Sequence, residues 1–406
     1  MRAETAQRFE ALETLASNMR ALFTKAGYEP VAPAILQPAD ILLDCSGEAL
    51  RARTYVFTDL DGTELCLRPD ITVPTARLYM ERHPTVFEEA RYCYNGPTFR
   101  YSPASSARKN KGKTVRPREF RQMGLELYAM RDRLAAEAEI FKLTLDGVEQ
   151  AGLSDYRIKI GDLGLFGAFL DAIDMPDRWR VRLKHHFWRP ELFHKLLHEL
   201  AWSSENKSSE NKSSENNGEP QKNTPHLDPK DPISAMLVVS RYMSKNNIPL
   251  FGNRTLEEIT LRLLEQQLDS DQQRLSGDHV QLIEDYLDIN GPPRAAVARI
   301  NDLTDKAGIS IDKALRNFEK RLDLFKARGI DLKSTEFSAE FGRDFEYYTG
   351  FVFQVEAPDS AQIGPIAGGG RYDKLLQKLG ASEKVKAIGC AIHTERLLTV
   401  VEGEME

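Results

Sequence analysis

The sequence predicts an α+β protein built on a mostly antiparallel sheet flanked by helices. Three observations support this prediction. Strand-like stretches follow one another as hairpins rather than in strand–helix–strand alternation. Amphipathic helical patterns lie on either side of them. The 406 residues are 41% hydrophobic, which is enough to bury a large core. We expect a discontinuous core at 1–165 plus 327–406, interrupted by a mostly helical insertion at 166–326.

The first half of the chain carries the clearest local patterns. Apolar residues at helical spacing predict a helix over 4–26. Residues 55–68 read as a hairpin with an Asp-Gly turn, which leads to Asp70 and a helix that starts near Thr72. On the local pattern alone, Asp70 or Thr72 simply caps that helix.

A long hairpin over 92–128 is the centre of the chain. Gln122, Gly124 and Glu126 recur at period two and therefore share one face of its second strand. Burying an amide and a carboxylate on one face is costly without a partner. The pattern therefore predicts a small polar ligand beside Gln122 and Glu126, with Gly124 leaving room for it.

The remaining segments alternate between helical and sheet-like patterns. The tandem SSENK repeats contain no apolar residue and predict a disordered segment at 203–231. Further elements are expected as follows: helices at 132–150, 165–202 and 233–326 with a break at 291–293, strands at 156–161, 335–341, 347–355 and 387–392, and a Gly368–Gly370 turn that opens a helix.

Charge and cysteine content exclude several classes of protein. The net charge of −6 gives no overall basic surface for nucleic acid. The four cysteines are far apart and form no CxxC pair, which argues against a disulfide framework or a zinc site. His194 and His198 lack the glutamate of metalloprotease motifs, so no metal is expected. With no signal peptide and no long apolar run, we expect a soluble cytoplasmic protein without a membrane segment or cofactor.

The basic stretch 108–121 has two interpretations. It contacts nucleic acid or an acidic partner, or it is a solvated hairpin tip, and a charge run alone does not decide between them.

Six ordered blocks give the sequence a specific resemblance. They resemble the catalytic core of histidyl-tRNA synthetases, which are class II synthetases. The match covers about 1–165 and 327–399, and it implies the class II fold, usually in a dimer. The blocks are LRPDIT (67–72), GPTFRY (96–101), REFRQMGLEL (118–127), RDFEYYTGFVF (343–353), GGGRYDKL (368–375) and AIGCAIHTERL (387–397).

The resemblance implies a histidine-binding pocket. Asp70 or Glu126 would meet the ammonium of the ligand, and Arg100 or Arg343 its carboxylate. Glu126 and tyrosine hydroxyls would meet the imidazole. The implied histidine-binding residues are Asp70, Thr72, Arg100, Gln122, Glu126, Arg343, Tyr347, Tyr348 and Tyr372.

Several departures from the synthetase pattern argue against adenylation. No anticodon-binding domain is expected after the last block. Arg116 and Arg396 still match ATP-contacting positions, so nucleotide or partner contacts remain open. The departures are Ile71 for a Gly, Ser102 for the Glu of the second class motif, Arg343-Asp344-Phe345-Glu346 for Arg-Gly-Leu-Asp, and His393 for a small residue beside the adenine.

A core that keeps amino-acid contacts but loses ATP features resembles a related family, the regulatory subunits of ATP phosphoribosyltransferase. That resemblance implies a non-catalytic protein of histidine biosynthesis. It would pair with a short-form catalytic subunit in a hetero-oligomer, respond to L-histidine, form a homodimer and bind no tRNA. Two alternatives remain: a synthetase-like enzyme that adenylates histidine or a related amino acid, and a structural dimer with a vestigial pocket. The stoichiometry, the partner surface and the role of the insertion stay open.

Overall fold

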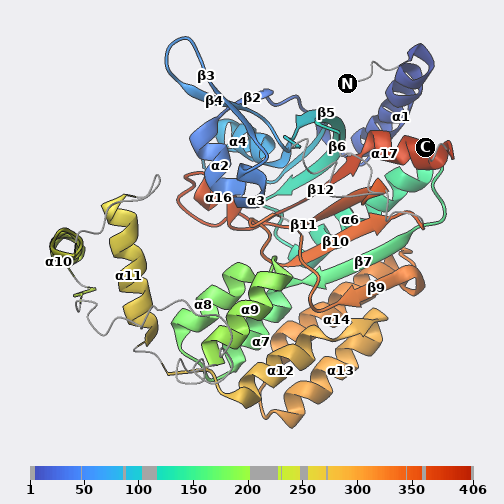
Figure 1. The fold of residues 1–406 in the computed structure, drawn as a ribbon. Coiled ribbons are helices and arrows are strands. Elements are labelled where there is room, and N and C mark those ends of the chain that lie inside the picture. Colours follow the sequence, from blue (N-terminus) through green and yellow to red (C-terminus); the bar gives the residue numbers. More distant parts are fainter. Residues whose placement is uncertain are drawn as a thin grey trace. The chain divides into compact units, whose positions relative to one another are not determined.

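A computed structural model describes residues 5–46, 48–85, 88–102, 117–201, 227–229, 231–246, 255–270, 273–343, 345–358 and 363–403. It contains two compact units (Figure 1). Unit 1 comprises Met1–Ile173, Leu183–Phe193 and Gln281–Glu406, and unit 2 comprises Asp174–Arg182 and His194–Val280. Arg116, the basic residues 108–116 and the low-complexity residues 203–226 lie outside the described residues.

Unit 1 is built on a nine-stranded sheet with the order β1-β5-β6-β12-β11-β10-β7-β9-β8. Neighbours pair antiparallel except β1 with β5 and β7 with β9, which confirms the predicted α+β fold with a mostly antiparallel sheet. A smaller sheet has the order β2-β4-β3. The strands are β1 (Glu29–Pro30), β2 (Leu36–Pro38), β3 (Tyr55–Thr58), β4 (Glu64–Leu67), β5 (Ala90–Phe99), β6 (Glu119–Tyr128), β7 (Arg157–Asp162), β8 (Asn290–Gly291), β9 (Thr335–Ser338), β10 (Phe351–Glu356), β11 (Ala367–Arg371) and β12 (Ala387–His393).

Helices occur in both units. The first is capped by the Thr5 side chain, which accepts a hydrogen bond from the Arg8 N–H. The helices are α1 (Ala6–Lys25), α2 (Ala39–Ser46), α3 (Glu48–Arg51), α4 (Thr72–Arg82), α6 (Arg133–Gln150), α7 (Leu163–Ala172), α8 (Asp177–His186), α9 (Pro190–Ala201), α10 (Pro232–Lys245), α11 (Leu256–Ser270), α12 (Gly277–Leu287), α13 (Pro293–Lys306), α14 (Asp312–Ala327), the 3-10 helix η2 (Leu332–Ser334), α16 (Leu375–Lys378) and α17 (Thr394–Val401).

One face of the large sheet is apolar and packs against α6, which lies beside β6, β12 and β11 in Figure 1. The Phe141 ring of α6 lies 5.7 Å from Phe351 and 4.7 Å from Phe353, both on β10. Phe325 of α14 joins them, 4.9 Å from Phe141. Phe351 and Phe353 are two residues apart on β10, so side-chain alternation places both on the face of the sheet that packs against α6.

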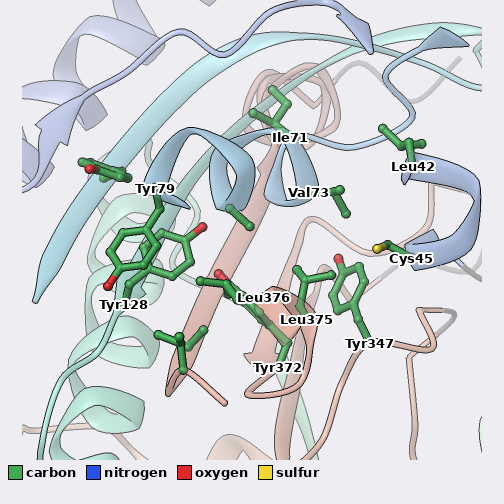
Figure 2. Packing of buried hydrophobic residues seen from close by; sticks show 14 of the residues in the cluster. Leu42, Cys45, Ile71, Val73, Tyr79, Tyr128, Tyr347, Tyr372, Leu375 and Leu376 are labelled. Carbon is green, nitrogen blue, oxygen red and sulfur yellow. The ribbon is translucent and has the colours of Figure 1, made fainter. Parts of the chain in front are cut away.

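The opposite face carries a second buried cluster, rich in tyrosine (Figure 2). Tyr79 of α4 stacks on Tyr128 of β6 with ring centroids 4.5 Å apart. Tyr372 lies 6.4 Å from Tyr128 and 5.7 Å from Tyr347. Because Tyr128 is in phase with Gln122 and Glu126 on β6, the polar residues of the central hairpin face this aromatic side of the sheet.

A buried ion cluster ties α14 to the core of unit 1. Glu137 of α6 is fully buried and pairs with Arg371 of β11 and Arg321 of α14. Arg321 also donates to Asp162 at 2.7 Å. Both α13 and α14 fall within unit 1, whereas the sequence assigned 166–326 as a whole to the insertion.

Two local predictions near the end of the chain were wrong. The segment Gly368–Gly370 is not a turn but the centre of β11, where it pairs with residues of β10 and β12 that its local propensity does not report. The strand expected from Tyr347 begins only at Phe351, after a loop. The helix break expected at 291–293 is present: α12 ends at Leu287, α13 begins at Pro293, and β8 between them pairs with β9.

The described residues of unit 2 are mostly helical. Leu227, Ala235, Val239 and Leu264 form its buried cluster. The Trp179 indole N–H donates to the Gln273 carbonyl at 2.9 Å. Across the described parts of both units, no helix has the length and apolar character needed to cross a membrane.

Candidate ligand pocket

Glycines on the aromatic side of the sheet make room for three polar side chains that define a candidate ligand pocket. A Cβ on Gly124 would collide with the Tyr94 ring and hydroxyl. One on Gly389 would collide with the Glu126 carboxylate, and one on Gly368 with the Arg343 guanidinium. Tyr94, Glu126 and Arg343 therefore lie flat across neighbouring strands, which explains why a glycine triplet occupies a central strand.

Glu126 borders this pocket and is fully buried. Tyr94 donates its hydroxyl hydrogen to Oε1 at 3.2 Å, and Tyr372 donates to Oε2. Burial raises the pKa of the Glu126 carboxyl to about 8, although the hydroxyls of Tyr372, Thr72 and Tyr94 oppose the shift. Near physiological pH the Glu126 carboxyl therefore exists in both its neutral and its ionised form, with the neutral form in excess.

Asp70 lies at the corner between β4 and α4 and is 3% exposed. Its Oδ1 accepts from the Val73 N–H at 3.2 Å, so the expected capping role is present. Its Oδ2 is buried and has no hydrogen-bond partner among the described residues. Burial raises the pKa of this carboxyl, while the Val73 N–H, Arg100, Arg68 and the Tyr347 hydroxyl hold it down. A cap needs one oxygen, which leaves the second for a ligand.

Arg100 follows β5 and reaches the same space from above the sheet. Its Nε donates to the Pro69 carbonyl at 2.9 Å. Its guanidinium lies 5.0 Å from the Phe120 ring and 5.6 Å from the Phe345 ring. Burial lowers the pKa of Arg100 to about 10, with Asp70 acting in the opposite direction. The side chain remains a cation at neutral pH, and the Asp70 carboxyl beside it favours the charged form.

Arg343 and Gln122 leave further buried atoms unsatisfied. Arg343 donates through Nη1 to the Phe353 carbonyl at 3.2 Å, but its Nε meets no acceptor in the described part of the chain. Gln122 is 3% exposed, and its Oε1 has no donor within the described ranges. Gln122 lies opposite His393 in the β6–β12 register.

The unsatisfied atoms define what this pocket accepts. Asp70 Oδ2 and Gln122 Oε1 are acceptors that require donors, and Arg343 Nε is a donor that requires an acceptor. Buried polar atoms are normally hydrogen-bonded, so such a set points to a ligand. An ammonium and a carboxylate on one small molecule, as in a free α-amino acid, would satisfy all three.

Most of the site residues inferred from the sequence meet here. Buried Tyr347 and Tyr348 face the pocket, and Thr72 begins α4 beside Asp70. Arg396 donates to the Pro365 carbonyl at 2.9 Å, and its charge reaches His393 at the edge of the pocket.

Sequence reasoning missed Tyr94, which holds Glu126. The sequence offered one indication of its role. Tyr94 lies on the strand that pairs with β6, directly opposite Gly124 and two residues before Gly96.

Comparison with known proteins identifies the family. A family model described as histidyl-tRNA synthetase matches residues 3–209 and 255–397. An ATP phosphoribosyltransferase regulatory subunit from Chelativorans sp. (strain BNC1) is 31% identical over 90% of this chain and 92% of that relative. A regulatory subunit of the same name from Mesorhizobium japonicum is 30% identical over 96% of this chain and 98% of that protein.

The chain belongs to the histidyl-tRNA synthetase-like family, among the ATP phosphoribosyltransferase regulatory subunits. Solved structures agree on the fold. One from Bacillus halodurans C, titled an ATP phosphoribosyltransferase regulatory subunit/histidyl-tRNA synthetase, has a TM-score of 0.66 at 18% identity and covers 99% of this chain and 82% of that chain. The histidyl-tRNA synthetase from Nostoc sp. PCC 7120 has a TM-score of 0.60 at 15% identity, and the match covers 100% of this chain and 77% of that chain. The class II fold inferred from the six blocks is confirmed.

Proposed function

We propose that this chain is the non-catalytic regulatory subunit of an ATP phosphoribosyltransferase and that its pocket binds free L-histidine. The observation that carries the ligand is the set of buried atoms without a hydrogen-bond partner among the described residues, Asp70 Oδ2, Gln122 Oε1 and Arg343 Nε, together with a buried carboxyl that accepts from two tyrosine hydroxyls. Membership of the regulatory-subunit family supports the role.

The pocket would hold histidine in one orientation. The ammonium would lie between Asp70 Oδ2 and Gln122 Oε1, and the carboxylate would meet Arg343 Nε beside the Arg100 cation. The imidazole would then extend toward Glu126. A carboxylate has about four acceptor positions, so Glu126 can accept an imidazole N–H in addition to its two hydroxyl donors. Hydrogen bonds to charged groups contribute roughly 1.5–3 kcal/mol each, enough for selective binding.

The transferase chemistry would belong to a short-form catalytic subunit in a hetero-oligomer. Histidine would shift that complex toward a less active state, and a coupling free energy of ~1–3 kcal/mol is typical of such regulation. We further propose a homodimer of this chain in the cytoplasm that binds no tRNA. Arg116 and Arg396 remain candidates for nucleotide or partner contacts.

Calorimetric titration with L-histidine tests the ligand. Asp70→Asn should weaken binding about 10- to 100-fold, because the amide offers the ammonium no negative charge. Asp61→Asn, in the exposed turn between β3 and β4, is the matched control and should bind as the parent does. Equal affinities for the parent chain and Asp70→Asn would contradict the proposed pocket.

Turnover assays with a short-form catalytic subunit test the role. Mixing the two proteins should produce a complex on size-exclusion chromatography, raise turnover, and make it sensitive to histidine. If the chains neither associate nor alter each other's behaviour, the regulatory assignment is wrong.

Retained Arg100 and Arg396 favour one competing function, a synthetase-like enzyme that activates histidine. This candidate predicts histidine-dependent exchange of pyrophosphate into ATP by the isolated chain. Exchange at an enzyme-like rate would replace the regulatory proposal, whereas its absence at saturating histidine would remove the competitor.

A further inference from the structure

The smaller sheet, β2-β4-β3, has one face made only of aliphatic and aromatic side chains. The register of the three strands aligns rows of residues, and side-chain alternation places rows two positions apart on the same face. We call this face the outward face. Its residues are Leu36, Tyr55 and Leu67 in one row and Pro38, Phe57 and Leu65 in the other.

The other face of this sheet packs on the core of unit 1. Cys66 and Gln37, in the row between the two rows of the outward face, are buried, whereas their neighbour Val56 on the edge strand β3 is exposed. None of the six residues of the outward face is buried, and Phe57 and Leu36 are 40% and 49% exposed. The sheet therefore buries one side and leaves apolar side chains on the second side accessible.

Apolar surface continues around the outward face. Leu60, in the turn between β3 and β4, is completely exposed, and Ile35, next to Leu36, is exposed as well. The exposed Tyr101 ring lies 5.9 Å from the Tyr55 ring. Figure 1 shows the β3–β4 hairpin projecting from the rest of unit 1. An antiparallel sheet with one face on the core normally turns polar side chains to water, so a continuous apolar surface of this kind marks an interaction site.

Charged residues of opposite sign lie at the two ends of β3. Arg51 and Arg53 precede the strand, and Asp59 and Asp61 follow it in the turn. A two-fold contact uses the same surface on both copies, so that surface must complement itself. If the β3 strands of two copies run antiparallel across the contact, the basic end of each copy meets the acidic end of the other. If they run parallel, like charges meet, which is unfavourable. The charges around the outward face therefore fit a second copy of this chain in one orientation.

We propose that the outward face binds the outward face of a second copy of this chain, with the two β3 strands antiparallel across a two-fold axis. The inference deepens the homodimer of the proposed function and rests on it. The apolar residues form the centre of the contact, and the charged ends of β3 form its rim, which is the usual arrangement of a protein interface. The two copies of the sheet then stack face to face, as packed sheets do in protein interiors.

Sedimentation velocity over a concentration series of the full chain tests the proposal. The parent chain should be a dimer, and Phe57→Asp should raise its dissociation constant at least about 100-fold, because a two-fold contact buries the new carboxylate twice. Leu261→Asp, on α11 and 50% exposed, is the matched control and should leave the dimer unchanged. Circular dichroism checks that each variant folds. If Phe57→Asp does not fold, Phe57→Ser removes the ring without adding a charge and should weaken the dimer at least about tenfold.

Reversal of the charged ends of β3 tests the orientation. A variant with Asp59→Lys and Asp61→Lys has two basic ends, and a variant with Arg51→Glu and Arg53→Glu has two acidic ends. Each should dimerise at least about tenfold more weakly than the parent, because like charges meet in its homodimer. An equimolar mixture should recover the dimer, since opposite charges then meet at both ends. A mixture that dimerises no better than either variant alone would refute the antiparallel arrangement.

Other results would overturn the proposal without touching the histidine pocket. A parent dimer that Phe57→Asp does not weaken places the homodimer contact on another surface. A parent chain that is monomeric at every concentration contradicts the homodimer itself, whereas calorimetry and turnover assays test histidine binding and the regulatory role separately. If Phe57→Asp also prevents such a monomer from associating with a short-form catalytic subunit, the outward face belongs to that subunit and not to a second copy.

Discussion

Replacing Glu126 with glutamine should change how stability depends on pH. Burial raises the pKa of the Glu126 carboxyl from its usual 4.5 to about 8, so the folded chain holds a proton there that the unfolded chain releases above its own lower pKa. The stabilisation contributed by the protonated Glu126 carboxyl is fully present below the pKa of this group in the unfolded chain. It is lost as the pH rises through the pKa of this group in the folded chain. The free energy of unfolding should therefore fall by up to about 1.4 kcal/mol per pH unit between these values.

Urea unfolding at about pH 5.5 and about pH 7.5 measures this effect. Glutamine does not titrate, so Glu126→Gln should gain stability relative to the parent by up to about 3 kcal/mol between the two conditions. Taking the difference between the two proteins cancels the contributions of other titrating groups. Glu10→Gln, at an exposed position of α1, is the matched control and should track the parent at both pH values.

One result would refute the reasoning. If the difference in unfolding free energy between the parent and Glu126→Gln is the same at both pH values, the carboxyl has the same pKa in the folded and unfolded chains. The pocket would then be better solvated than its burial indicates, and the contribution assigned to Glu126 in holding an imidazole would have to be revised downward.

Other substitutions give equally direct expectations. Gly389→Ala places a Cβ on the Glu126 carboxylate and should weaken histidine binding at least about tenfold by calorimetry, whereas Gly167→Ala in α7, whose Cβ would meet Lys184 only at 3.7 Å, should not. Glu137→Gln breaks the buried ion cluster and should cost ~3–5 kcal/mol in urea unfolding, and a loss below about 1 kcal/mol would contradict that role. Asp132→Ala removes the side chain that caps α6 and should cost about 1 kcal/mol in the same assay.

Local patterns predicted the central hairpin and one side of the pocket. Period-two alternation placed Gln122 and Glu126 on one face of β6, and the structure has both buried there. The Asp132 cap likewise follows from residues adjacent in sequence. These features were predictable because their physical causes, side-chain alternation and backbone capping, act within a few residues.

The rest of the pocket depends on contacts between distant segments. The glycine triplet looks like a turn by composition, yet Gly368 is a strand residue that pairs with β10 and β12, and its missing side chain leaves room for Arg343. Tyr347 looks like a strand residue, yet it stacks with Phe345 in a loop. Tertiary packing overrides local preference at these positions, as is common where a binding site is formed.

The geometry around Glu126 indicates how a bound ligand could be sensed elsewhere in unit 1. Tyr372, which donates to Glu126, is the next residue after Arg371, and Arg371 pairs with Glu137 in the buried ion cluster. The same Glu137 pairs with Arg321 of α14. An imidazole that donates to Glu126 beside the Tyr372 hydroxyl would thus act one residue away from the charges that hold α14 against the sheet. Buried ion pairs depend steeply on geometry, so a small displacement at Tyr372 alters the energy of the cluster more than apolar packing would. Regulation requires a ligand that interacts differently with two arrangements of such an element, so regulation through this route requires a second arrangement of α14 that the bound ligand disfavours or favours.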